Sequence, residues 1–225
     1  MNTLTLKALA VSGYSFVIFS LCLFLPAWSF DFWQAWLYLF SIFCPALTIT
    51  FYMLKHNPQL TEHRLKGGAT TEQRFLQRVI RLLSPLFWVS SLILSAFDHR
   101  LHWSHVPASL AILADIAVIL GWLVIFFVFK ENNYASATVE IVDLQKVIST
   151  GPYAIVRHPM YSGTVLLVLF APMALGSWWG LAFSVPSSFL IVLRLLDEEK
   201  LLLQTLNGYD TYCDKVRYRL VPGVW

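Results

Sequence analysis

The sequence predicts an all-α membrane protein, a polytopic transmembrane helical bundle of about five to six spans that ends in a C-terminal helical hairpin. Of its 225 residues, 57% are hydrophobic and only 13% are charged, whereas a soluble domain usually carries about 25% charged residues. A chain this poor in charge cannot cover its apolar surface with polar groups. Lipid is therefore the solvent that we expect around most of it.

Four segments meet the length of about 20 mainly apolar residues that a helix needs to cross the hydrocarbon core. They are residues 6–26, 33–54, 79–97 and 107–129. The first segment could be a signal peptide, but its apolar run is long and no small-x-small cleavage site follows it. We therefore expect a membrane helix there as well.

A longer apolar stretch, residues 161–196, exceeds the length of one ordinary span. Its middle contains Pro172 and Gly176, residue types that break helices. We expect two helices that turn at or near the far face of the membrane. The total is six crossings if this hairpin spans the bilayer and fewer if it is shallow.

The basic residues predict the orientation. If the helices alternate in direction, all 16 Lys and Arg residues except Arg100 fall on the same side of the membrane. Because basic loops stay in the cytoplasm, both termini are expected there. The protein is then a multi-pass integral protein of the bacterial inner membrane, or of the endoplasmic reticulum in a eukaryote.

Charge and cysteine usage exclude several other classes. The formal net charge of +3 does not indicate a nucleic-acid partner. Cys22, Cys44 and Cys213 show no CxxC spacing, so we expect neither a disulfide framework nor a metal site built on them.

Two further groups of polar residues have more than one interpretation. His99, His102 and His105 form a His-x-x-His-x-x-His pattern in a short outer loop. This spacing could bind a metal, but a wet interfacial loop is the simpler interpretation, and we predict no metal. Asp115 is the acidic residue well inside a predicted span. It is either a functional group, as intramembrane carboxylates often are, or a structural contact within the bundle.

The first candidate site cluster ends the long polar segment that follows the fourth span. The sequence there reads Gly151-Pro152-Tyr153-Ala154-Ile155-Val156-Arg157-His158-Pro159-Met160-Tyr161-Ser162-Gly163. Gly-Pro forces a turn, and Pro159 pushes His158 toward an extended conformation. Arg157 and His158 should therefore lie at a fixed bend before a helix N-terminus, which suits an anionic group.

The second candidate cluster follows the predicted hairpin and comprises Arg194, Asp197, Glu198 and Glu199. Arg194 and Glu198 are four residues apart, so they share one face of a helix. The hairpin returns this cluster to the side of the membrane that it left. The two clusters can thus form a cytoplasmic site for a polar cofactor beside a lipidic substrate. Alternatively, Arg157 is a snorkelling residue and the acids are a solvated helix start.

Together the motifs resemble the isoprenylcysteine carboxyl methyltransferase family, which is related to integral-membrane phospholipid methyltransferases. The resemblance covers about residues 132–225, and the first four helices match only in being apolar. It rests on Gly151-Pro152-Tyr153, Arg157-His158-Pro159-x-Tyr161-x-Gly163, Arg194-x-x-x-Glu198-Glu199 and Tyr209-x-x-Tyr212.

The resemblance implies a division of the chain and a set of site residues. Residues 1–129 would hold four spans, and residues 130–225 would form a methyltransferase core with a cofactor loop, the hairpin and an amphipathic tail. Arg194 and Glu199 would be catalytic, with Arg194 near an acceptor carboxylate. Glu198 would pair with the amino group of S-adenosylmethionine. The residues implied to bind this cofactor are Gln145, Val147, Ile148, Tyr153, Arg157, His158, Pro159, Tyr161 and Glu198.

The expected reaction is methyl transfer from S-adenosylmethionine to a lipidic or small acceptor, with a carboxylate favoured. The methyl sulfonium is already activated, so the protein mainly has to hold donor and acceptor in line. One alternative is a sterol-reductase-like enzyme that uses NADPH, although such enzymes typically carry Asn where this chain has Met160. The other is a non-catalytic membrane protein or transporter.

The C-terminal tail carries an apolar stripe with helical spacing, formed by Leu202, Leu206, Tyr209, Cys213 and Val216. This stripe predicts either a helix that lies at the membrane interface or a lid over the cofactor, and the two roles are compatible.

Overall fold

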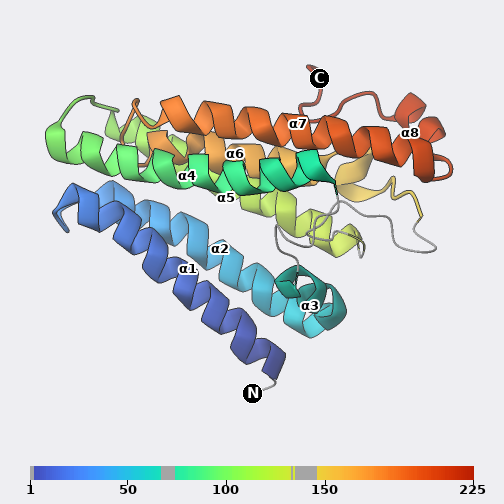
Figure 1. Cartoon of the computed structure of the whole chain (residues 1–225), viewed down its shortest axis with the longest axis horizontal. Helices are drawn as coiled ribbons and strands as arrows, with labels where there is room; N and C mark the ends of the chain where they lie inside the picture. Colours follow the sequence, from blue (N-terminus) through green and yellow to red (C-terminus); the bar gives the residue numbers. More distant parts are fainter. Residues whose placement is uncertain (1–2, 67–73, 133, 135–145) are drawn as a thin grey trace.

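A computed structural model of the chain describes residues 3–66, 74–132, 134 and 146–225, and the fold in this part is all-α as predicted (Figure 1). The elements follow in the order α1 (Thr3–Ala27), α2 (Trp33–His56), α3 (Pro58–Lys66), α4 (Phe75–Leu101), α5 (Ala108–Glu131), the 3-10 turn η2 (Gly151–Ala154), α6 (Pro159–Ala174), α7 (Leu181–Thr205) and α8 (Tyr209–Lys215).

Four helices are long and apolar enough to cross a membrane, and they confirm the four predicted N-terminal spans. These are α1, α2, α4 and α5, with 24 to 27 residues each. The apolar helix α6 has only 16 residues, about 24 Å at 1.5 Å per residue. That is shorter than the hydrocarbon core of about 30 Å. The four long helices make the chain an integral membrane protein. Because α6 is short, the depth to which the α6–α7 hairpin enters the membrane stays a prediction.

The turns after α1, α4 and α6 meet at one end of the bundle (Figure 1). There the Phe32 ring stacks on the His99 ring with centroids 3.9 Å apart. The Ser177 hydroxyl donates a hydrogen bond of 2.5 Å to the Asp98 carboxylate. These contacts join the three turns, which is the alternation of helix direction that the sequence predicts.

The other end, which we call the basic end, carries α3, η2, α8 and the polar ends of α5 and α7 (Figure 1). Salt bridges there join Arg74 to Asp197 and Arg157 to Glu199. Arg100 lies at the opposite end, with its guanidinium 5.8 Å from the centre of the Trp28 ring.

Two glycines bring α5 and α6 into close contact beneath the basic end. A Cβ atom added to Gly121 would lie 2.7 Å from the carbonyl oxygen of Gly163, and one added to Gly163 would lie 2.7 Å from that of Gly121. Small residues allow this approach between membrane helices. The contact fixes the first turn of α6, which carries Tyr161, against α5.

The hairpin turns where the sequence predicts it. The helix α6 ends at Ala174, soon after Pro172. Gly176 then adopts φ +78°, a left-handed conformation that glycine accepts at no steric cost. The helix α7 continues past the predicted end at residue 196 as far as Thr205.

Two polar elements differ from the expectation. The sequence analysis predicts no helix between the second and third spans. The structure has α3 there, which begins at Pro58, and the side chain of Asn57 accepts a hydrogen bond from the Leu60 N–H at 3.1 Å. The C-terminal stripe is divided between α7 and α8 by Gly208, which has φ +82°. Its residues still form one apolar cluster, in which Leu202, Leu206 and Cys213 pack on buried Tyr209, Tyr212 and Val216.

Candidate functional site

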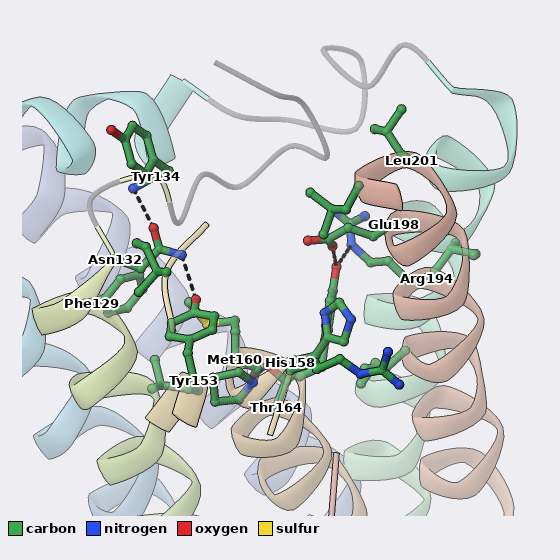
Figure 2. Close-up of a pocket in the computed structure, with 18 of the residues that line it drawn as sticks. Phe129, Asn132, Tyr134, Tyr153, His158, Met160, Thr164, Arg194, Glu198 and Leu201 are labelled. Carbon is green, nitrogen blue, oxygen red and sulfur yellow. Dashed lines mark hydrogen bonds between the residues drawn. The ribbon is translucent and has the colours of Figure 1, made fainter. Parts of the chain in front are cut away.

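A cavity of about 660 Å³ lies at the basic end and reaches inward to Trp88 and Trp122, near the middle of α4 and α5. Its walls come from α3, α4, α5, η2, α6, α7 and α8. Figure 2 shows Asn132 and Tyr153 on one side of the space and Arg194 and Glu198 of α7 on the other, with His158 between them. The volume falls in the range of about 300–1,000 Å³ that is usual for small-molecule sites.

The structure brings the two predicted clusters together around this cavity. Every predicted cofactor residue within the described part of the chain lines it, and so does Arg194. Gln145 lies outside the described residues. Glu199, predicted to be catalytic with Arg194, does not line the cavity. The lining residues from the prediction are Val147, Ile148, Tyr153, Arg157, His158, Pro159, Tyr161 and Glu198.

Three side chains form a hydrogen-bonded chain on the cavity wall, which we call the wall triad: Tyr161, Arg194 and Glu198. The Tyr161 hydroxyl donates to the Glu198 carboxylate and accepts a hydrogen bond from Arg194 Nε at 3.1 Å. Pro159 starts α6 at its first position, which suits a residue without an N–H. Tyr161 therefore lies in the first turn of α6, opposite one face of α7.

Glu199 lies behind this wall in a buried ion cluster with Arg157, His158 and Arg219. Its side chain is 5% exposed, and Arg157 Nη1 approaches Oε1 at 2.9 Å. Arg219 Nε donates to Oε2 at 2.7 Å, and His158 Nε2 is 3.7 Å from Oε1. Burial raises the pKa of Glu199, but interactions with His158 and Arg219 and the charge of Arg157 lower it further, to about 2. The carboxylate is therefore ionised at neutral pH.

The C-terminal tail holds the bend before α6. The N–H groups of Arg157 and His158 donate to the carbonyl oxygens of Tyr218 at 2.8 Å and Arg219 at 3.0 Å. The Ser162 hydroxyl donates to the carbonyl of Leu220 at 2.7 Å. The tail thus satisfies the backbone of the His-Pro bend and places Arg219 on Glu199. The sequence analysis missed Arg219, because an extended tail segment has no periodic signal.

An aromatic wall faces the triad across the cavity. Asn132 Nδ2 donates to the Tyr153 hydroxyl at 2.7 Å, as Figure 2 shows. The Tyr212 hydroxyl donates to the Tyr153 carbonyl at 2.7 Å, which ties α8 to η2. Burial raises the pKa of Tyr153 to about 12, so its hydroxyl keeps its proton. Asn132 is a lining residue that the sequence analysis did not single out.

Residues of α4 fix the polar turn of α7, and the sequence analysis missed them too. Arg74 Nη2 donates to Asp197 Oδ1 at 2.7 Å, and Gln77 Nε2 donates to Asp197 Oδ2 at 2.5 Å. Gln77 Nε2 also lies 3.2 Å from the Arg194 carbonyl oxygen, which accepts a hydrogen bond. These contacts hold the α7 turn that presents Arg194 and Glu198.

Two arginines add positive charge to the cavity wall. Arg64 and Arg81 both line the cavity, and the Arg64 guanidinium lies 4.7 Å from the centre of the Phe129 ring. Burial and the charge of Arg81 lower the pKa of Arg64 to about 10, so it stays charged. The cavity wall therefore combines the guanidinium groups of arginines, the carboxylate of Glu198 and aromatic rings.

One comparison with known proteins gives a match. Residues 110–208 match a sequence model of the phospholipid methyltransferase family. A search of curated proteins gave no match. The matched segment begins inside α5 and supplies most of the cavity lining, including the wall triad. Over this segment the chain is similar to the phospholipid methyltransferases, a family of membrane methyltransferases.

Proposed function

We propose that this protein is an integral-membrane, S-adenosylmethionine-dependent methyltransferase with a lipidic or small acceptor. One observation carries the proposal: the segment that is similar to phospholipid methyltransferases is also the segment that supplies most of the cavity. A sequence likeness limited to the apolar helices would not support a shared function, because apolar helices of unrelated proteins have similar compositions.

The groups on the wall fit the chemistry of S-adenosylmethionine. Glu198 would take the ammonium group, and the rings of Tyr153 and Tyr212 would border the adenine. Val147 and Ile148 would supply apolar contacts on the same side. When bound, the cofactor supplies a methyl group activated by a sulfonium. The protein itself has to exclude water and hold the acceptor in line, which is worth about 7–11 kcal/mol in favourable cases.

Arg194 would orient the acceptor. Its guanidinium forms a planar fork that grips a carboxylate or phosphate through two hydrogen bonds. Tyr161 accepts a hydrogen bond from Nε of this guanidinium and so restricts its orientation. The acceptor implied by the family likeness is a lipid, and we propose that the group beside Arg194 is anionic, with a carboxylate as the first choice.

The deep part of the cavity would take the apolar tail of such an acceptor. Trp88, Trp122, Leu167, Val168 and Ile191 line it. Because α4 and α5 are membrane helices, this part lies at the depth of the lipid tails. A tail could therefore enter from the bilayer while the polar group stays at the basic end.

The test is a methyl-transfer screen with radiolabelled S-adenosylmethionine and purified protein. The acceptors are a prenylated cysteine with a free carboxylate, an amine phospholipid and a small thiol, with Arg194→Ala protein as the control. We expect label in one acceptor class with wild-type protein and none with the variant. Absence of transfer to every class, together with absence of cofactor binding, would contradict the proposal.

We further propose that the basic end and both termini face the cytoplasm, of the bacterial inner membrane or of the endoplasmic reticulum. Single cysteines at Ser149, at the basic end, and Trp103, at the other, test this in a background that lacks the native cysteines. An impermeant thiol reagent should label Trp103→Cys in intact cells and leave Ser149→Cys unlabelled. The reverse result would place the site on the outer face.

A further inference from the structure

Besides Glu199, two carboxylates among the described residues are almost completely buried, and they differ sharply in their partners. Asp98 is 1% exposed and Asp115 is 2% exposed. Asp98 accepts hydrogen bonds from the backbone and side chain of Ser104 and from Ser177, at 2.5 to 2.7 Å. Neither oxygen of Asp115 has a hydrogen-bond partner among the described residues. A buried carboxylate without such partners is costly, so its retention requires a reason.

The surroundings of Asp115 are rich in donors that also lack partners. The hydroxyls of Tyr38 and Ser41, on neighbouring turns of α2, are fully buried and form no hydrogen bond with a described residue. The same holds for the buried indole N–H of Trp88 and that of Trp122. Ser41 lies beside the Asp115 carboxylate, and Tyr38 interacts with both Trp88 and Asp115. Ser41 and Tyr38 thus lie near the carboxylate, and Trp88 lies next to Tyr38.

Trp122 lies on the same face of α5 as Asp115. It follows Asp115 by about two turns of α5, and long side chains in helices lean toward the N-terminus. Small adjustments of the side chains, or a bound water, would convert this set into a complete hydrogen-bond network. Internal waters typically make about three hydrogen bonds to buried polar groups of this kind.

The same two indoles form the deep wall of the cavity. Trp88 and Trp122 both line it, whereas their N–H groups are buried from solvent. Asp115, Tyr38 and Ser41 are not part of the lining. The carboxylate therefore is not part of the cavity wall.

We infer that Asp115 is a positioning residue for tail length: it gathers the N–H groups of Trp88 and Trp122 and thereby sets how deep the apolar tail of an acceptor can reach. This inference rests on the proposed function, since it assigns the deep cavity to that tail. It gives the intramembrane carboxylate a role in specificity and not in the methyl transfer itself.

The experiment measures the binding of fatty acids of increasing chain length to purified protein held in amphipol. In wild type, the affinity should rise by about fourfold per methylene until the tail reaches the indoles, and then stop rising. Asp115→Leu removes the carboxylate that accepts the hydrogen bonds and so frees the indoles. The chain length at which the affinity stops rising should therefore move by at least one methylene. Asp115→Asn keeps one acceptor oxygen and should move it less. Asp98→Asn is the matched control, because it alters a buried carboxylate away from the cavity.

The outcomes are distinct. A chain-length limit that is the same in Asp115→Leu as in wild type overturns the inference, and so does an equal shift in Asp98→Asn. If Asp115→Leu does not fold, β-(3-benzothienyl)alanine in place of Trp88 and Trp122 removes only the N–H groups, because it keeps the bicyclic ring, and this protein should show the shifted limit. An unchanged limit there overturns the inference. Binding of S-adenosylmethionine to wild type is measured separately, so failure of the proposed function is recognised independently.

Discussion

Glu198 and Glu199 are neighbours in the sequence but belong to two different regions of the molecule. Glu198 is part of the wall triad and lines the cavity, where Tyr161 donates a hydrogen bond to it. Glu199 is part of the buried ion cluster, where Arg157 and Arg219 surround its carboxylate. Adjacent residues on a helix point about 100° apart, so one acid can face a ligand while the next stabilises the fold.

Neighbouring acidic residues of one motif can therefore have different roles, and each role needs its own test. The wall triad keeps a carboxylate and a guanidinium where a ligand can reach them. The ion cluster instead joins α7, the bend before α6 and the C-terminal tail through Glu199. We therefore propose that Glu199 is a positioning residue and that Arg194 is the residue that touches the acceptor.

The largest expected effect comes from Arg194→Ala in the wall triad. Loss of a preorganised donor at a reacting group typically costs about 100- to 1,000-fold in rate. We expect such a loss in turnover, with cofactor affinity and thermal stability nearly unchanged. Arg194→Lys should restore little, because it lacks the planar fork. If Lys restores full turnover, or if Ala only lowers expression, Arg194 is an interfacial anchor.

The next effect should come from Glu199→Ala in the ion cluster, and it should appear as instability. Removing one member of a buried ion pair typically costs about 3–5 kcal/mol. We expect about 3 kcal/mol, because Arg219 keeps 32% of its side chain exposed. Unfolding in detergent, compared with Asp214→Ala at an exposed position, measures this. A variant that is as stable as wild type but has lost turnover would show that Glu199 acts in catalysis.

A smaller effect is expected from Glu198→Gln, which keeps the shape of the wall triad but removes its charge. A hydrogen bond to a charged group contributes about 1.5–3 kcal/mol. The affinity for S-adenosylmethionine should therefore fall about tenfold or more while stability stays near that of wild type. Calorimetry on His158→Ala and Tyr161→Ala tests the rest of this pocket. Wild-type affinity in all three variants would place the cofactor elsewhere.

The smallest effect is a pH dependence that belongs to the ion cluster alone. The folded pKa of Glu199, about 2, lies below its ordinary value of 4.5. Its stabilisation should be complete above pH 4.5 and decline as the pH falls toward 2. The difference in unfolding free energy between wild type and Glu199→Gln should shrink over this interval. A difference that stays constant down to pH 2 would show that the charge of Glu199 does not act in the cluster.

Much of the fold could be predicted because partition into lipid depends on the composition of each segment. The four long spans and the turn at Gly176 follow from apolar length and from helix breakers. The short helix α3 is polar, so hydropathy does not reveal it. Its signal was the pair Asn57-Pro58, a helix cap followed by a proline at the first position.

The candidate site could be predicted only where a local motif carries it. Arg194 and Glu198 are recognisable because they are four residues apart on a helix. Tyr161 is recognisable because it belongs to the motif that follows Gly151-Pro152. Which of Glu198 and Glu199 faces the cavity depends on how α7 rotates against α6, and that rotation is set by packing. Arg219 lies in an extended tail and contacts Glu199 from a distant position in the sequence, so no local pattern predicts this contact.

Calorimetric titration of the purified wild-type protein with S-adenosylmethionine and, separately, with NADPH tests the central claim most directly. The cavity joins a carboxylate to aromatic rings on a segment that is similar to methyltransferases. We predict saturable binding of S-adenosylmethionine at one site and no binding of NADPH. Binding of NADPH without binding of S-adenosylmethionine would contradict this account and favour a reductase.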